Sequence, residues 1–254
     1  MVRIIDLSVA HQNFASEPYP PTLTHTNHRE GARRMGLLAG VPADSFKDGM
    51  GMASDNISGS AHSGTHVDAP WHYGPTSEGK PSRTIDKVPL EWCYGNGVVL
   101  DMRHKEAGAE ITVVDVKEAL QKINHTLSEG DIVLIHTGTD KYWGTPDYLP
   151  KQSGLGLEAT KYILDHGVRT IGIDAWGVDR PVKNMVEALK GGDPQALWPS
   201  HMYGREKEYL QIEKMANLDQ LPGPTGFKVA AFPVKFEDAS GGWTRAVAIL
   251  EDES

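Results

Sequence analysis

Cysteine is almost absent from this chain, because Cys93 is the only one among 254 residues. A lone thiol forms no internal disulfide and has no CxxC partner, which excludes a disulfide framework and a CxxC zinc site. We expect Cys93 to pack as a small apolar side chain. The GxSxG elbow of serine hydrolases is also missing, which argues against catalysis by a serine nucleophile.

Blocks of lysine or arginine are missing too, and 34 acidic residues outnumber 25 basic ones, which gives a net charge of −9. Such a balance disfavours binding to nucleic acid or to an anionic membrane. No apolar run approaches the length of a membrane span, and the opening "MVRIIDLSVAHQNF" turns polar at Asp6, unlike a secretory signal. We therefore expect a cytoplasmic protein with no nucleic-acid or membrane partner.

The chain does have the length and apolar content for one sizeable core. Hydrophobic residues make up 39% of its positions, which predicts a single domain over residues 1–254. Thr112 to Ile123, with a capping threonine, and Gly156 to Gly167, with a terminal glycine, have the pattern of helices. The predicted strands are short β-branched segments: residues 3–8, 97–102, 131–138, 169–174, 227–236 and 244–250.

The alternation of these strands and helices predicts an α/β fold, a mixed β-sheet core with packed helices. Its last two strands should pair as an antiparallel hairpin across "EDASGG". Four stretches are too polar or too broken by glycine and proline to predict regular elements. We expect these loops to be lids or pocket walls, or to order against another subunit, with the first the most mobile. They are residues 15–56, 74–88, 138–155 and 190–206.

One short segment, "HSGTHVDAPWH", contains three histidines and an aspartate: His62, His66, Asp68 and His72. Metal ligation needs imidazoles and a carboxylate to converge within about 2.0 to 2.2 Å of one ion. Gly64 permits the necessary curl of the backbone, and the pattern differs from the helical HExxH of metalloproteases. A metal site on a loop or strand edge is therefore predicted for the set, although each histidine alone is typical of a hydrated loop.

This segment resembles the HxGTHxDxPxH signature of the cyclase family of metal-dependent hydrolases, which includes bacterial kynurenine formamidase and isatin hydrolase. Other segments resemble family landmarks in the family's order, so the resemblance covers most of the chain. It implies a swivelling β/β/α-like cyclase fold in one domain. The matching segments are "IIDLS", "GDIVLIHTG", "TIGIDAWGVD", "IEKMANLDQLP", "GFKVAAFPVKF" and "RAVAIL".

The resemblance also implies a histidine and a glutamate near the C-terminus. His201 and Glu213 occupy the matching segment "SHMYGREKEYLQIEKMANL", where alone each would read as a solvated side chain, Glu213 in a helix-compatible stretch. By resemblance, His62, His66 and Asp68 hold one ion, and Asp68 and Glu213 bridge to, or share, a second position with His201. The number of ions stays open, and these ligands suit zinc and manganese equally.

A bound divalent ion with an open position lowers the pKa of water to about 7 and polarises a carbonyl group. His72 is then the expected catalytic proton shuttle, which takes a proton from the water and delivers it to the leaving nitrogen. Aromatic and basic residues near the motifs are the candidates for substrate binding, although Asp179 is an equally good local partner for Arg180. These candidates are Trp71, Tyr73, Trp176 and Arg180.

Three functions are compatible with such a site. The first is a metal-dependent amidohydrolase that opens a non-peptide C–N bond, in an aryl formamide or in a cyclic amide such as isatin. The second is a lactone hydrolase or a cyclase or dehydratase on the same site, and the third is a metal-stabilised binding protein without catalysis. The resemblance also implies a homodimer or homotetramer.

Overall fold

The computed structural model describes residues 1–14 and 16–251. Ala15, which begins the first predicted loop, and residues 252–254, which end the predicted domain, lie outside the described residues. The chain separates into two compact units, one made of Met1–Pro18 and the chain from Ala61 onward, and the other of Tyr19–Ser60. The single domain over residues 1–254 stays a prediction.

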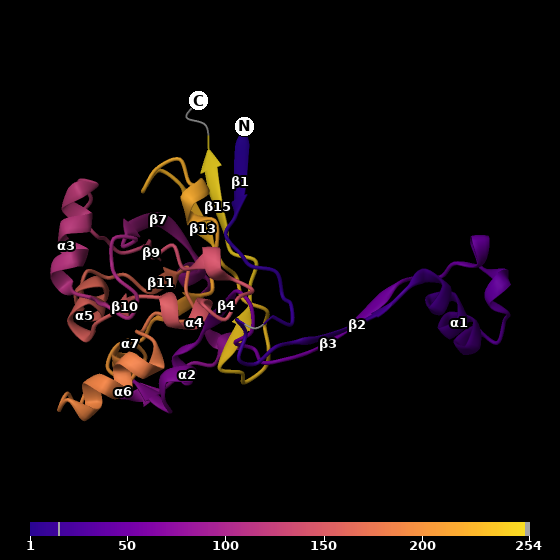
Figure 1. Ribbon diagram of the computed structural model, residues 1–254. Coiled ribbons are helices and arrows are strands. Elements are labelled where there is room, and N and C mark those ends of the chain that lie inside the picture. Colours follow the sequence, from indigo (N-terminus) through magenta and orange to yellow (C-terminus); the bar gives the residue numbers. More distant parts are fainter. Residues whose placement is uncertain (15, 252–254) are drawn as a thin grey trace. The chain divides into compact units, whose positions relative to one another are not determined.

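A mixed sheet forms the centre of the larger unit, and the described part of the chain contributes nine strands to it (Figure 1). Its four middle strands β7, β9, β11 and β12 run parallel, and the flanking strands pair antiparallel. The predicted α/β fold with a mixed sheet is thus confirmed. In spatial order the strands are β1 (Val2–Asp6), β15 (Val247–Glu251), β13 (Lys228–Ala230), β7 (Tyr94–Asp101), β9 (Asp131–His136), β11 (Thr170–Ile173), β12 (Leu210–Glu213), β4 (His66–Asp68) and β14 (Gly241–Trp243).

Apolar side chains on both faces of the sheet explain why its strands read as nearly continuous hydrophobic runs. Successive strand residues point to opposite faces. Val98 and Leu100 accordingly join one buried cluster, whereas Val99 joins the other. The helices α3 (Val113–Lys122) and α5 (Leu157–Asp165) supply Val116 and Ile163 to the first cluster and lie side by side in Figure 1.

The two predicted helices, α3 and α5, match the prediction at their ends. Thr112 caps α3 in a reciprocal capping box with Asp115, and Gly167 follows α5 with φ 90°. The other α-helices of the larger unit are α2 (Pro70–Tyr73), α4 (Tyr148–Lys151), α6 (Val182–Lys190) and α7 (Pro199–Tyr203), and its other strands are β5 (Thr76–Ser77), β6 (Lys80–Pro81), β8 (Glu110–Ile111) and β10 (Gly154–Leu155).

One expectation about the irregular stretches of the larger unit is wrong, and the expected C-terminal hairpin is confirmed only in its antiparallel pairing. The stretches 74–88, 138–155 and 190–206 contain β5, β6, α4, β10 and α7, which are too short to give a hydrophobic period. The C-terminal strands β13 and β15 do pair antiparallel, but the segment between them is no simple hairpin. It carries β14, which crosses to the other end of the sheet and pairs with β4.

The smaller unit contradicts the expectation that residues 15–56 have no regular elements. Strands β2 (Thr22–Thr26) and β3 (Ser54–Ser58) pair antiparallel, and α1 (His28–Ala39) lies between them in the sequence. Asn27 caps α1 by accepting a hydrogen bond from the Glu30 backbone, and Gly40 ends it with φ 68°. The helix escaped prediction because its buried residues are the small Gly31, Ala32 and Gly36, which give no apolar stripe.

None of the helices formed by residues 1–14 and 16–251 has the length and apolar content that a membrane crossing requires.

Candidate metal centre

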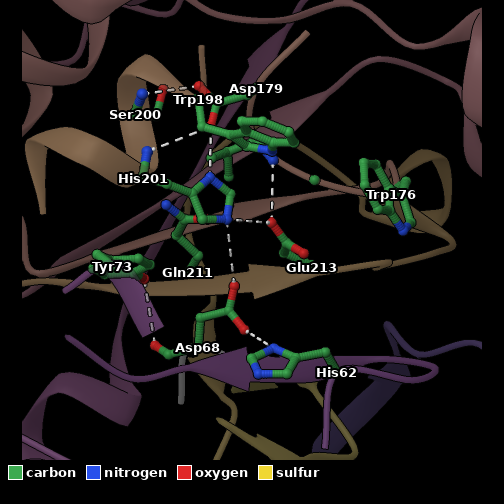
Figure 2. Close-up of polar contacts among 12 residues, drawn as sticks. His62, Asp68, Tyr73, Trp176, Asp179, Trp198, Ser200, His201, Gln211 and Glu213 are labelled. Atoms are coloured by element: carbon green, nitrogen blue, oxygen red, sulfur yellow. Dashed lines mark hydrogen bonds and ion pairs between the residues drawn. The ribbon is translucent and has the colours of Figure 1, made fainter. Parts of the chain in front are cut away.

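Five segments of the chain bring the predicted ligands and His72 together. Strand β4 carries His66 and Asp68, and β12 ends at Glu213, which lies directly across from His66 in the antiparallel register. Side chains directly opposite each other in a sheet lie on one face, so this pairing sets the imidazole beside the carboxylate. Helix α7 supplies His201, the loop before β4 supplies His62, and α2 supplies His72. Figure 2 shows His201 between Asp68 and Asp179.

His66 is fully buried, and its ring is held by the loop that precedes it. Its Nδ1 lies 2.8 Å from the carbonyl oxygen of Gly64, so Nδ1 carries the proton and the lone pair is on Nε2. That Nε2 lies 3.2 Å from Asp68 Oδ1 and 3.6 Å from Glu213 Oε2. Among the described residues, neither His66 Nε2 nor Asp68 Oδ2 has a hydrogen-bond partner. These two buried atoms can each give a lone pair to a metal, and neither uses it in a hydrogen bond to a described residue. Together with the Glu213 carboxylate, they fit a divalent metal ion.

Asp68 is the buried anion at the middle of this cluster. Burial opposes its charge, but the neighbouring His72, His62 and His66 outweigh this penalty and hold the pKa of Asp68 well below its usual range. His62 Nδ1 lies 2.6 Å from Asp68 Oδ1, and the other ring nitrogen lies 2.8 Å from Ser240 Oγ. Both nitrogens of His62 are therefore engaged, and His62 can bind an ion only by giving up one of these partners.

His201 is oriented from the side opposite the ion site. Its Nδ1 contacts Asp179, while its Nε2 lies 3.6 Å from Glu213 Oε1 and 3.9 Å from Asp68 Oδ2. Burial lowers the pKa of His201, but Asp179 and Glu213 more than compensate and raise it to about 9. Asp179 is itself fixed by the backbone N–H of Ser200, which donates to its Oδ1.

Glu213 lies at the end of strand β12, which corrects the helix-compatible assignment of its segment. Burial and the nearby Asp68 raise the pKa of its carboxyl group to about 8. The backbone N–H of Val178 donates to Oε1. A carboxylate that is this costly to ionise without a nearby cation is well suited to a metal ion, which restores the charged form.

His72 differs from the other histidines because it keeps a face open to solvent. Its ring lies 4.1 Å from the His62 ring and 5.5 Å from the His201 ring, centre to centre. Partial desolvation, assisted by the neighbouring imidazoles, lowers the pKa of His72 to about 4 despite the attraction of Asp68. The imidazole is therefore neutral at pH 7 and can accept a proton.

Asp68 belongs to two overlapping sets of potential ligands. In each set one donor atom from every residue lies within 4.8 Å of the others. One set is His62, Asp68 and His72, and the other is His66, Asp68 and Glu213. The geometry thus brings all six predicted metal and catalytic residues to one place, and their separate roles stay predictions.

The predicted substrate-binding residues are not all at this place. Trp71 is 44% exposed beside His72, and Trp176 is half-buried on the Glu213 side in Figure 2. Tyr73 is only 1% exposed and stacks on Tyr209, so its side chain packs in the core, and its substrate contact stays a prediction. Nη2 of Arg180 lies 3.8 Å from Oε2 of Glu110. Arg180 therefore pairs with Glu110 and not with Asp179, whose carboxylate contacts His201.

Sequence reasoning missed the residues that support the ligands. Asp179 was visible in the "WGVD" segment, but only as a neighbour of Arg180. Ser240, in a loop far along the chain, carried no signal at all. Gln152 joins two loops of the site, because its side chain accepts from the Trp176 backbone and donates to the Asp179 carbonyl.

Comparison with known proteins matches most of this chain to a family. The family described as "Putative cyclase" matches residues 5–180. Isatin hydrolase of Roseibium aggregatum is 26% identical over 199 residues, which are 74% of this chain and 72% of the relative. Kynurenine formamidase of Bacillus thuringiensis is 27% identical over 189 residues, covering 74% of this chain and 76% of the relative.

Solved structures share the fold. An isatin hydrolase bound to the product analogue thioisatinate has a TM-score of 0.76 at 22% identity, covering 99% of this chain and 93% of its own. Isatin hydrolase A of Ralstonia solanacearum has a TM-score of 0.77 at 24% identity, covering 98% and 92%. These structures confirm the predicted fold, and the family match over residues 5–180 confirms the predicted resemblance. The chain belongs to the cyclase family.

Proposed function

We propose that this protein is a metal-dependent hydrolase that opens the C–N bond of a small aryl formamide, such as N-formylkynurenine, or of a cyclic amide, such as isatin. The proposal rests on His66 Nε2 and Asp68 Oδ2, which have no hydrogen-bond partner in the part of the chain that the structure describes. Together with Glu213 they form a buried set of potential metal ligands near the solvent-exposed His72. The names of the two curated relatives support the choice of substrates.

His66, Asp68, His201 and Glu213 would hold the ion, with His62 joining if it leaves Ser240 or Asp68. Oxygen and nitrogen donors without thiolate favour Zn²⁺ or Mn²⁺, as one ion or as two that share Asp68. When bound, such an ion supplies the positive charge that activates water and polarises a carbonyl oxygen.

Proton transfer is then the role of His72. His72 is neutral at pH 7, so its imidazole takes a proton from the attacking water as the new C–O bond forms. The same imidazolium returns this proton to the amide nitrogen as the C–N bond breaks, which yields a carboxylic acid and an amine. Asp179 holds the His201 ring so that its Nε2 faces Glu213 and Asp68. His72 therefore carries the proton, and the buried residues hold the charge.

Two finer features belong to this proposal. Trp71 and Trp176 would contact the flat substrate, while Arg180 would reach a substrate carboxylate only by leaving Glu110. We also propose a homodimer or homotetramer, because Leu37 and Leu38 on α1 are 87% and 89% exposed. Sedimentation that finds only monomer at micromolar concentration would contradict this assembly.

The experiment combines elemental analysis of the purified protein with assays of N-formylkynurenine, isatin, a lactam and a lactone, before and after chelation. We expect a bound divalent ion and hydrolysis of at least one amide, lost on chelation and restored by Zn²⁺ or Mn²⁺. His66→Ala should abolish both, whereas His166→Ala, on an exposed histidine of the same chain, should change neither. Hydrolysis that survives both chelation and His66→Ala would sink the proposal, and activity on lactones alone would favour a lactonase.

A further inference from the structure

A buried lysine follows directly after the ligand candidate Glu213. The Lys214 backbone adopts φ 55°, a left-handed conformation that is costly for a residue with a side chain, and its side chain is almost wholly buried. The ammonium group donates to both carboxylate oxygens of Glu17, at 3.0 and 2.8 Å, and to the His62 carbonyl oxygen at 2.7 Å. An ammonium group has three protons, and three acceptors surround this one.

Glu17 reaches this lysine from the N-terminal part of the chain and is just as deeply buried. Its Oε2 also accepts a hydrogen bond of 3.0 Å from the backbone N–H of Gly64. The ion pair therefore contacts the metal centre at two points, the carbonyl of His62 and the amide of Gly64, and Lys214 is also joined directly to Glu213 in the chain. Gly64 in turn supplies the carbonyl that fixes the ring of His66.

Other contacts tie the same segments together. The backbone N–H of Val9 donates to Thr65 Oγ1, and that hydroxyl donates to the Lys214 carbonyl oxygen at 2.6 Å. The ring of His11 covers Gly64 so closely that a Cβ added there would lie 2.6 Å from it. We call residues 9–14 and 16–17 the N-terminal strap.

We propose that Glu17 and Lys214 are positioning residues for the metal centre, through which the N-terminal strap fixes the spacing of His62 and His66 from Glu213. This role rests on the proposed function, since it concerns the binding of the same ion. Stability alone does not require such a pair, because an apolar pair of similar volume commonly stabilises a core equally well. What an apolar pair cannot do is hold the His62 carbonyl and the Gly64 amide at fixed points.

The test compares metal affinity with the stability of the metal-free fold. Affinity for Zn²⁺ and Mn²⁺ is measured by competition with a chromophoric chelator, and the unfolding midpoint by thermal denaturation of the metal-free protein. The variants are Glu17→Gln, Lys214→Met and the double variant E17Q/K214M, which leaves no unpaired buried charge and keeps an acceptor for Gly64. Lys161→Met, which removes one partner of the partly exposed pair Lys161–Glu158, is the control.

We expect E17Q/K214M to unfold near the wild-type midpoint but to bind metal about 10- to 100-fold more weakly, the usual effect of losing support behind a ligand. If the double variant fails to fold, Glu17→Asp decides, because it keeps both charges and withdraws the carboxylate. It should weaken metal binding as well. Wild-type affinity in either variant overturns the positioning role alone, whereas wild-type protein that binds neither ion overturns the proposed function and this inference with it.

Discussion

Oδ2 of Asp179 lies 2.5 Å from Nδ1 of His201, on the side of the ring that faces away from the other ligand candidates. This contact fixes the proton on Nδ1 and leaves Nε2 to face Glu213 and Asp68. The same carboxylate accepts from the Ser200 backbone, so its own orientation is set by the start of α7. Asp179, which is not a candidate ligand itself, thus determines that Nε2 is the nitrogen with which His201 can bind a metal ion.

Asp179→Asn should weaken metal binding more than it weakens the fold. The amide keeps the shape but no longer stabilises the Nδ1–H of His201, so we expect affinity to fall by about 10- to 100-fold. Titration of the metal-free variant with Zn²⁺ or Mn²⁺ measures this. Asp165→Asn, which changes an exposed carboxylate paired with Lys207, is the control and should bind like the wild type.

Removing His72 should separate catalysis from metal binding. His72→Ala deletes the neutral, solvent-facing imidazole while the buried donor set stays in place, so we expect kcat to fall by about 10² to 10⁴ at unchanged metal content. Steady-state assays on the substrate found active, with elemental analysis of the same sample, provide both readouts. Loss of the metal together with activity would instead make His72 a ligand, as its place in one of the two ligand sets allows.

Hydrophobic patterns predicted most strands of the central sheet and both helices that pack on it, but missed the short strands β4, β12 and β14. The strand β9 and the helix α3 follow from local patterns, since a run such as "DIVLIH" is buried on both faces and Thr112 caps its helix. Helix α1 could not be found in this way, because small glycines and an alanine make its buried face. Its caps Asn27 and Gly40 were the only local signals.

The metal centre was predictable only in part, for a related reason. His62, His66 and Asp68 are close in sequence, but the pairing of β4 with β12 sets Glu213 beside His66 from about 150 residues away. No local pattern encodes that register, so the resemblance to a family had to supply it. Ser240 and Glu17 lie outside any motif, and only the folded chain brings them to His62 and Gly64.

The metal-free protein should lose stability as the pH rises above about 6.5. Folding raises the pKa of His201 from 6.5 to about 9 and that of Glu213 from 4.5 to about 8. A raised pKa means that the folded state binds more protons than the unfolded state, so this stability is present at low pH and is lost as the pH passes through the folded values. His72, whose pKa is lowered to about 4, acts only below 6.5.

Thermal midpoints of chelator-treated protein between about pH 6.5 and 9 test this linkage. Bound metal requires neutral imidazole and ionised carboxylate, so the midpoint of the metal-loaded protein should fall less, and the gap between the two forms should widen with pH. In His201→Gln the slope of the metal-free protein should be shallower. A metal-free midpoint that stays level over this range would contradict the protonation of His201 and Glu213 in the fold.

Substitution of Tyr73 tests whether it contacts the substrate or only the core. Its ring stacks on Tyr209 at 5.2 Å, and its hydroxyl reaches the Asp68 carbonyl oxygen only at 3.5 Å. Tyr73→Phe should therefore change the free energy of unfolding by no more than about 1 kcal/mol and leave KM unaltered, because it removes a long hydrogen bond and no packing. Tyr73→Ala should lower the free energy of unfolding by about 3–5 kcal/mol, since it would open a cavity in the core beside Tyr209. Denaturant unfolding and KM measured on both variants decide the matter, and a raised KM in a stable Tyr73→Phe protein would return the hydroxyl to the substrate site.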